Sequence, residues 1–345
     1  MPYAGVVFDQ AGNLYGTTYG STTGVYFGAV YKVDNTGHES VLHFLRARDG
    51  TRPFSAVLLD SGGDIYETNG EGSFGRQGSV LELNKLGEPK LLFSWGKLHM
   101  GTAPGSFPEA GLIRDEEGNL YGTTSLGGTG GGEGTVYTIN HLTGEFTVVY
   151  SFGAPPDGCS PTGELVFGAD GSLYGTTDIG GQYGWGTIFK VDPTSGAETV
   201  LYSFMDGADG GNPLSDLVED SEGALYSTTA VGGAYGYGTV FKFDPTGQTL
   251  TTLHNFGSGG GDGATPFAGV TRDQAGNLYG TTTAGGTRSP GGRPHPQRCP
   301  LGAFSGWRTC RGGTLWDRER PNCSGERGRR HPCFGFWLLI FSPHG

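Results

Sequence analysis

The sequence predicts an all-β fold, and within that class a β-propeller whose blades are four-stranded sheets of about 53 residues, five complete and a sixth partial. Three observations support this prediction. A tyrosine-containing motif recurs every 51 to 55 residues, each repeat contains four short runs rich in β-branched and aromatic residues, and no segment shows a sustained helical period of apolar residues. A ring of such sheets buries each face against a neighbour, which one sheet alone cannot do. A β-solenoid is the alternative, disfavoured because its coils are usually shorter.

The recurring motif is GNLYGTT, which first occurs at residues 12–18. Its tyrosines are Tyr15, Tyr66, Tyr121, Tyr174, Tyr226 and Tyr279. In the fourth repeat the predicted strands span residues 164–167, 172–177, 186–192 and 198–204. An Asp-x-x-Gly turn precedes the second strand, since Asp accepts local backbone N–H groups and Gly can take a positive φ. The glycine after the tyrosine, as in Gly16 and Gly175, predicts close approach by a neighbouring sheet.

The chain divides into a repeat region, residues 1–287, and a tail, residues 288–345. Repeats start near residues 2, 53, 108, 161, 213 and 266, where a proline recurs. Because Met1 directly precedes the first of these prolines, we expect the chain to be a fragment cut at a repeat boundary. The third strand of the sixth repeat should begin at Gly291 or Gly292, but Arg-Pro-His-Pro follows there instead.

The tail differs from the repeats in composition. It holds ten of the 22 basic residues, three of the 34 acids and four of the five cysteines. The repeat region therefore has a net charge of −19, and the tail one of +7. We predict that the tail is disordered or the product of a frameshift. A genuine Cys-rich tail is the alternative, although it lacks the closely spaced cysteine pair typical of a zinc site.

Several classes of function are disfavoured by composition and motifs. An acidic repeat region repels a phosphate backbone, so we predict no nucleic-acid partner. No apolar run is long enough to span a bilayer, and residues 1–20 lack the pattern of a signal peptide. The sequence contains no G-x-S-x-G, H-E-x-x-H or P-loop motif. We therefore predict a glycine-rich, acidic protein that is not an enzyme, needs no cofactor and is a monomer.

The string GNLYGTT…GG…GTVFKVDP…TVLYSF resembles the GloVer tandem-repeat proteins, a bacterial "choice-of-anchor" family, over about residues 2–287. This resemblance implies an exported protein of the cell surface or cell envelope, with no established catalytic residues. The pattern VxxDxxGNLYxxT is also similar to NHL and gluconolactonase-like propellers. That second resemblance implies a preference for six blades, with the first strand nearest the central axis. The chain departs from the GloVer family in lacking a recognisable export signal and anchor.

One rim of the predicted propeller combines carboxylates with aromatic rings. Loops that connect successive blades carry Asp49, Asp157, Asp209 and Asp262. Loops between the second and third strands carry Tyr183, Trp185, Tyr235 and Tyr237. Because strands alternate in direction, both sets should lie at the same rim, which would suit a sugar or a cationic ligand. The alternative is that Asp-Gly serves only turn formation and the rings pack between blades.

The opposite rim carries the repeated Asp-x-x-Gly turns. Each offers too few oxygens for a calcium loop, so we nominate no metal ligands, and calcium remains an alternative. Our prediction is thus a non-catalytic cell-surface scaffold that binds a carbohydrate or a protein. The alternative is a metal-dependent, gluconolactonase-like hydrolase or lyase, for which the inner strands offer Glu164, Glu219 and Arg272. A structural filler within a larger surface protein is a third reading.

Overall fold

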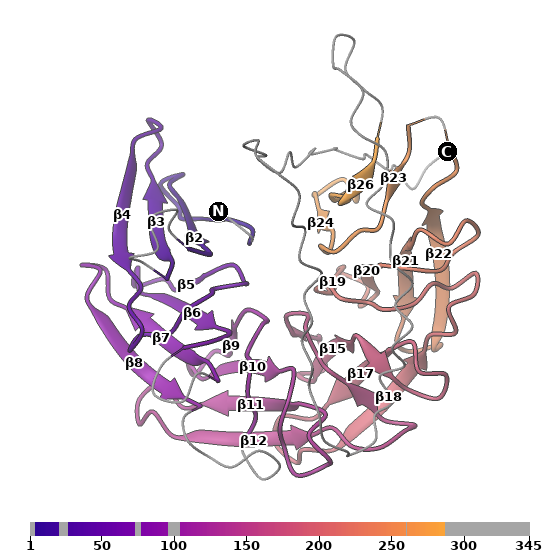
Figure 1. Cartoon of the computed structure of the whole chain (residues 1–345), viewed down its shortest axis with the longest axis horizontal. Helices are drawn as coiled ribbons and strands as arrows, with labels where there is room; N and C mark the ends of the chain where they lie inside the picture. The colour runs from indigo at the N-terminus through magenta and orange to yellow at the C-terminus, as the bar shows by residue number, and fades with distance from the viewer. Residues whose placement is uncertain (1–3, 21–26, 73–76, 96–103, 260, 287–345) are drawn as a thin grey trace, which may run out of the picture.

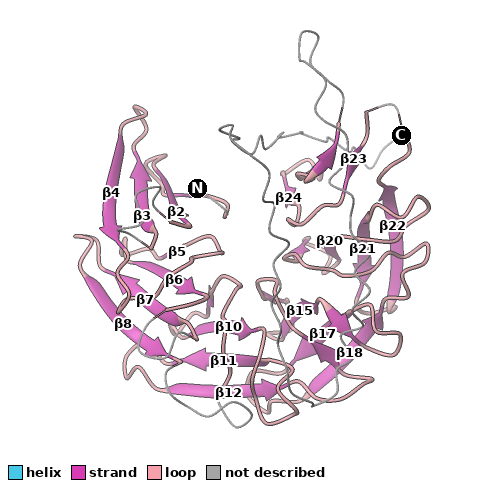
Figure 2. Cartoon of the chain, in the orientation of Figure 1, coloured by secondary structure: helices cyan, strands magenta, loops and turns pink. Residues whose placement is uncertain are grey.

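The computed structural model describes residues 4–20, 27–72, 77–95, 104–259 and 261–286. These residues form strands and no helix, as Figure 2 shows. Five four-stranded antiparallel sheets follow one another along the chain, each made of four consecutive repeat strands. Figure 1 shows them arranged as an arc around a central space, with β5, β9 and β19 toward the centre and β8, β12 and β22 along the outside. The predicted all-β class and the four-stranded repeat are confirmed.

The five sheets have nearly the same strand lengths. Sheet one contains β1 (Val7–Phe8), β2 (Leu14–Thr18), β3 (Ala29–Val33) and β4 (Glu39–Phe44). Sheet two contains β5 (Leu58–Leu59), β6 (Ile65–Asn69), β7 (Ser79–Leu83) and β8 (Pro89–Ser94). Sheet three contains β9 (Ile113–Arg114), β10 (Leu120–Thr124), β11 (Thr135–Ile139) and β12 (Phe146–Ser151).

The later sheets repeat this pattern. Sheet four contains β14 (Val166–Phe167), β15 (Leu173–Thr177), β17 (Thr187–Val191) and β18 (Glu198–Ser203). Sheet five contains β19 (Val218–Glu219), β20 (Leu225–Thr229), β21 (Thr239–Asp244) and β22 (Thr249–Asn255). The sixth repeat contributes β24 (Thr271–Arg272) and β25 (Leu278–Tyr279). Two short ribbons, β13 (Gly158–Cys159) with β16 (Ile179–Gly180) and β23 (Gly263–Ala264) with β26 (Ala284–Gly285), join loops.

The first strand of each sheet is shorter than the sequence predicts. In the fourth repeat it begins at Val166 rather than Glu164. There the backbone N–H of Glu164 donates to Asp216 Oδ1 of the next repeat, 2.6 Å away. The described residues include no helix long and apolar enough to cross a membrane.

The core lies between successive sheets. Between sheets four and five, for example, Ile188 and Phe204 of one sheet pack with Leu217, Phe241 and Phe243 of the next. Similar clusters fill the other junctions. Successive sheets therefore bury their facing surfaces against each other, as the repeat pattern predicts.

The prediction for the glycine after the repeat tyrosine is wrong in its detail. A Cβ atom on Gly175 would lie 2.5 Å from the ring of Phe189, which is its register partner on the third strand of the same sheet. At Gly16 the ring is that of Tyr31, again the register partner. The glycine thus makes room for an aromatic side chain of its own sheet, rather than for a neighbouring sheet.

The linkers between sheets share one backbone arrangement. The residue before each junction proline has a left-handed φ of 52° to 61°. These residues are Arg52, Phe107, Ser160, Asn212 and Thr265. The N–H of Asn212 donates to the Trp185 carbonyl of the preceding repeat (2.9 Å), and its carbonyl accepts the N–H of Ala230 in the following one (3.0 Å). The other four linkers make the equivalent pair of bonds, so each linker joins both flanking sheets.

The repeat threonines also hold the sheets together. Thr68 Oγ1 donates to the Ala110 carbonyl at 2.6 Å, and Thr176 Oγ1 to the Ser215 carbonyl at 3.0 Å. In both cases the acceptor belongs to the next repeat, just before its first strand. The predicted tail, residues 288–345, lies outside the described residues.

Candidate functional site

The Asp-x-x-Gly turns form one rim, here called the turn rim. Asp9 Oδ1 accepts the N–H groups of Ala11 and Asn13, both at 2.9 Å, and Oδ2 accepts the hydroxyl of Tyr15 at 3.1 Å. Asp220 and Asp273 repeat this pattern with their own turns and tyrosines. The side chain of Asn13 donates a further hydrogen bond that lowers the pKa of Asp9 against the cost of desolvation.

These bonds explain why aspartate and the repeat tyrosine recur together. The same carboxylate accepts hydrogen bonds from the backbone of the turn and from the tyrosine hydroxyl. Within the described ranges, no three histidine, cysteine, aspartate or glutamate side chains lie close enough together to hold a metal ion. The alternative of calcium at this rim stays a prediction.

The loops at the other end of the sheets carry the predicted aromatic residues. Tyr183, Trp185, Tyr235 and Tyr237 are 49%, 37%, 53% and 49% exposed. We call these four side chains the aromatic rim. They occupy equivalent positions in repeats four and five, in the segments DIGGQYGWG and AVGGAYGYG.

Glycine and backbone hydrogen bonds fix these loops. In repeat four the N–H of Gly181 donates to the Asp157 carbonyl (2.7 Å) and that of Gly186 to the Gly180 carbonyl (3.1 Å). In repeat five the N–H of Gly233 donates to the Gly207 carbonyl (2.8 Å), and that of Gly238 to the Gly232 carbonyl (2.9 Å). The ring of Tyr237 lies against Gly257, where a Cβ atom would come within 2.3 Å of it. The rings are thus presented by loops whose backbone is already ordered.

The predicted aspartates lie in loops of the same rim, but their carboxylates serve their own loops. Asp209 Oδ2 accepts the Tyr202 hydroxyl (3.2 Å) and the Met205 N–H (2.9 Å). Asp157 Oδ2 accepts the Tyr150 hydroxyl (2.8 Å) and the Gly153 N–H (2.6 Å). These are turn-forming bonds, so a role of the carboxylates in ligand binding stays a prediction.

In repeats one and five a histidine replaces that tyrosine. Asp49 lies 3.1 Å from His43 Nε2, and Asp262 lies 3.2 Å from His254 Nε2. Burial opposes ionisation of Asp262, but hydrogen bonds from Ser258 and His254 outweigh it and lower the pKa of Asp262.

The bond between the ring position and the loop aspartate was not identified from the sequence. A comparison of the second repeat with the others could have revealed this bond. Phe93, which cannot make this bond, stands at the ring position, and Pro104 stands where the other loops have aspartate. The two positions therefore change together within one chain.

Two acids of neighbouring repeats lie together just before the inner strands β14 and β19. Glu164 lies beside Asp216, and burial, with a contribution from the Asp216 charge, raises the pKa of Glu164 to about 8. Burial also raises the pKa of Asp216. Glu219 Oε1 accepts the Ala169 N–H at 3.4 Å, and the guanidinium of Arg272 lies over the Tyr226 ring. Asp216 was not among the predicted residues.

Glu67 is a further acid that sequence reasoning did not single out. It is 1% exposed and stands where most repeats have the motif glycine. Its register partner is Leu81, where the other sheets carry a ring, so the larger acid is accommodated by a smaller neighbour. Asn69 donates a 3.4 Å hydrogen bond to Glu67 Oε1, whereas Oε2 has no hydrogen-bond partner among the described residues.

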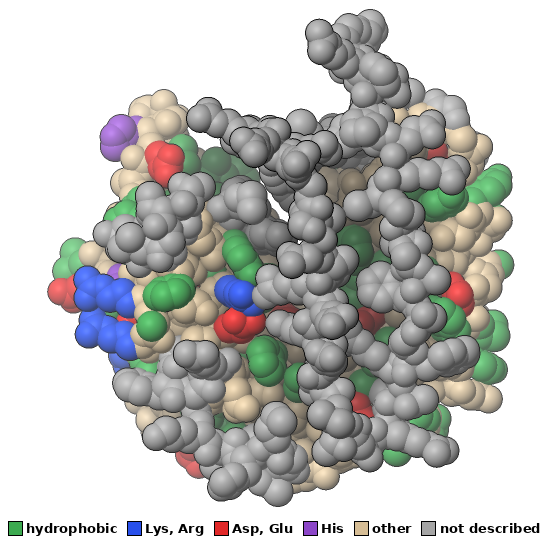
Figure 3. Space-filling view, viewed as in Figure 1, with side chains coloured by type: hydrophobic (Ala, Val, Ile, Leu, Met, Phe, Trp, Pro, Cys, Tyr) green, Lys and Arg blue, Asp and Glu red, His purple; other side chains and the backbone are tan. Residues whose placement is uncertain are grey.

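The face shown in Figure 3 carries charge unevenly. Lysine and arginine side chains gather at one side of the molecule, whereas acidic and hydrophobic side chains are scattered among small residues and backbone.

Solved structures similar to this chain share its architecture at low identity. The extracellular domain of a candidate one-component system from B. thetaiotaomicron matches with a TM-score of 0.53 and 12% identity, over 82% of this chain and 32% of that one. A candidate 6-phosphogluconolactonase from Bacteroides uniformis matches with a TM-score of 0.53 and 16% identity, over 82% of this chain and 78% of that one. These likenesses support a propeller-like fold.

No curated protein matches the chain in sequence. The sequence model of the Gloeobacter/Verrucomicrobia repeat matches residues 1–166 and 97–292, which together cover most of the chain. The matched region contains all six copies of the tyrosine motif and every described strand. The chain therefore belongs to the Gloeobacter/Verrucomicrobia repeat family.

Proposed function

We propose that this protein is a non-catalytic β-propeller scaffold of the bacterial cell surface, with five complete blades and a partial sixth. Its aromatic rim binds a carbohydrate or a protein surface. The observation that carries this proposal is the set of four half-exposed rings, Tyr183, Trp185, Tyr235 and Tyr237, at matching positions of adjacent repeats.

Two physical features of the rim favour binding. Aromatic side chains supply large contact areas and are enriched at the centres of binding interfaces. Their loops are held by glycines and backbone bonds, so little conformational freedom is lost when a ligand binds. A flat ring can also stack on the apolar face of a sugar while the tyrosine hydroxyl bonds to its polar groups.

The proposed location rests on relatives. The family resemblance implies export, and one structural neighbour is described as an extracellular domain. An acidic repeat region is compatible with that location.

A second candidate function is that of a lactonase-like hydrolase. It is favoured by the contact between Glu164 and Asp216, just before adjacent inner strands, and by a structural neighbour described as a candidate 6-phosphogluconolactonase. An acid whose pKa is raised toward neutrality is suited to general acid–base chemistry. Turnover of sugar lactones by the chain, lost on Glu164→Gln, would favour this second function over the first.

The proposed binding is tested by applying the full chain to a glycan array, followed by titration of any glycan that binds. Trp185→Ala and Tyr237→Ala should each weaken binding by about tenfold or more, as expected for a central aromatic contact. Leu142→Ala is the matched control, because Leu142 is exposed but lies in a turn at the opposite rim.

If no glycan binds, the same variants are compared for binding to purified envelope proteins of the source bacterium. Binding that is unchanged in both aromatic variants, to glycan and protein alike, would contradict the proposed role of this rim.

A further inference from the structure

Among the described residues, one edge of the sixth repeat's second strand has no partner strand. In sheets one to five the second strand lies between a first and a third strand. Among the described residues, β25 pairs with β24 alone. The backbone N–H and C=O groups on the other side of β25 therefore correspond to those that pair with a third strand in sheets one to five.

Among the described residues, the space beside this edge lacks the aromatic side chain that occupies it in most other repeats. At Gly122 and Gly175 a Cβ atom would clash with the ring of the third-strand aromatic, at 2.6 and 2.5 Å. At Gly280, the equivalent position, the nearest described neighbours of such an atom are 3.5 Å away. No described ring therefore covers Gly280.

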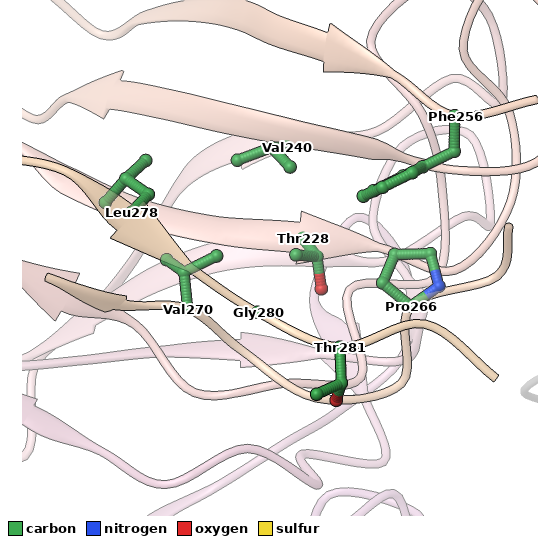
Figure 4. Close-up of a pocket in the computed structure, with 8 residues that line it drawn as sticks. All are labelled: Thr228, Val240, Phe256, Pro266, Val270, Leu278, Gly280 and Thr281. Carbon is green, nitrogen blue, oxygen red and sulfur yellow. The ribbon is translucent and has the colours of Figure 1, made fainter. Parts of the chain in front are cut away.

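An apolar pocket marks the same place, as Figure 4 shows. Val240, Phe256, Val270 and Leu278 line it together with Gly280. The equivalent residues of the preceding junction, Ile188, Phe204, Leu217 and Leu225, pack against Phe241 and Phe243 of a third strand. The last junction has the same walls, and among its described residues no third strand covers them.

Thr282 supplies a second point of complementarity. Thr177 and Thr229 each bond to the carbonyl two residues on and meet the first threonine of the third strand, at 2.8 and 2.9 Å between hydroxyl oxygens. Thr282 makes the same bond to the Ala284 carbonyl at 3.0 Å. It is therefore placed to meet a threonine from an added strand.

Tyr279 supplies a third point. In repeats one and five the third-strand Lys32 and Lys242 Nζ atoms lie 5.3 and 5.5 Å from the centres of the Tyr15 and Tyr226 rings. In repeat six Tyr279 donates to its turn aspartate, Asp273, at 2.9 Å, as Tyr15 and Tyr226 do to theirs. A lysine on an added strand would therefore meet a ring face already in position.

We propose that the open edge of β25 binds an extended segment of a separate polypeptide that has the pattern Thr-apolar-aromatic-Lys-apolar. The segment adds as the third strand of the sixth sheet, with its threonine at Thr282, its ring over Gly280 and its lysine over the Tyr279 ring. Main-chain pairing supplies affinity and these three side-chain sites supply specificity. The pattern of the occupant is that of the chain's own third strands in sheets four and five, TIFKV and TVFKF.

The test uses a labelled synthetic peptide with the sequence of residues 238–244, GTVFKFD, and the full chain. Fluorescence anisotropy should show saturable binding. Phe241→Ala in the peptide should weaken binding by about tenfold or more, since it empties a buried ring site. Lys242→Ala should weaken it by about two- to fivefold, as expected for an exposed cation–π contact.

On the protein side, Gly280→Leu should abolish binding, because its side chain would occupy the pocket. The contacts at Gly280 leave room for a Cβ atom, so the variant should keep the thermal midpoint of the parent. Leu142→Ala, at a distant turn, should bind the peptide normally. The peptide variants keep the test valid if Gly280→Leu fails to fold.

Three results would overturn the proposal. The first is the absence of saturable binding at millimolar peptide, or equal binding to Gly280→Leu. The second is strong hydrogen-exchange protection of residues 278–282 in the free chain, which would mean that the chain covers its own edge. The third is a dimer that Gly280→Leu dissociates, which would make a second copy the occupant.

Discussion

Replacing Glu67 by glutamine should remove a pH-dependent loss of stability. The Glu67 side chain is buried in sheet two, and its one described hydrogen bond, from Asn69, is 3.4 Å long. Burial raises the pKa of Glu67 from 4.5 to about 8, with the Asp49 charge as a smaller cause. The folded protein therefore holds this carboxyl in its protonated form at neutral pH.

The sign and size of the effect follow from this difference in pKa. Below pH 4.5 the carboxyl is protonated in both states, so it adds no pH dependence. Between pH 4.5 and about 8 the unfolded state ionises first, and stability falls as pH rises. A difference of 8 minus 4.5 units, at about 1.4 kcal/mol each, gives a total loss of about 5 kcal/mol, reached near pH 8.

The assay is urea denaturation of the parent and of Glu67→Gln at pH 5.5 and pH 8. The variant's advantage in free energy of unfolding should be about 3 kcal/mol larger at pH 8 than at pH 5.5, because most of the loss falls between these values. Glu82→Gln is the control, since Glu82 lies on the same sheet, is paired with Lys90 and should show no such growth. An advantage that is equal at both pH values would refute a buried neutral Glu67.

Two further predictions concern packing and the loop aspartates. Gly175→Ala should lower the free energy of unfolding by about 1 to 3 kcal/mol, because its Cβ would meet the Phe189 ring. Gly280→Ala should change it by less than about 1 kcal/mol; equal losses in the two would contradict the reasoning. Tyr202→Phe should cost about 1 kcal/mol by losing its bond to Asp209. In an Asp209→Ala background Tyr202→Phe should leave the free energy of unfolding almost unchanged. A double-mutant cycle by urea denaturation measures this, and additive losses from the two substitutions would contradict the bond.

The sheets could be predicted from the sequence because their signals are local. The tyrosine motif, the Asp-x-x-Gly turn and the alternation in segments such as TIFKV each specify structure over a few residues. The predicted bounds of the fourth repeat match β15, β17 and β18 closely. The predicted aromatic residues also lie exposed on shared loops, since strand alternation determines which loops share a rim.

The features that escaped prediction depend on contacts between repeats. The left-handed residue before each junction proline is Arg, Phe, Ser, Asn or Thr, so the residue type does not predict the positive φ. The Glu164–Asp216 contact joins the same position of two adjacent repeats, 52 residues apart, where the other repeats have glycine or alanine. The bond between ring and loop aspartate required a comparison of two positions at once, with Phe93 and Pro104 as the informative exception.

The linkers have a consequence for how such chains change length during evolution. Every linker makes the same pair of main-chain hydrogen bonds, donating backward and accepting forward, and side chains such as that of Asn212 add further bonds. A unit that runs from proline to proline therefore contains the main-chain groups that form these junction bonds with the units on either side. Recombination can therefore add or remove whole units while the junction hydrogen bonds are kept. A cut made inside a unit would instead leave two ends whose backbone groups do not match.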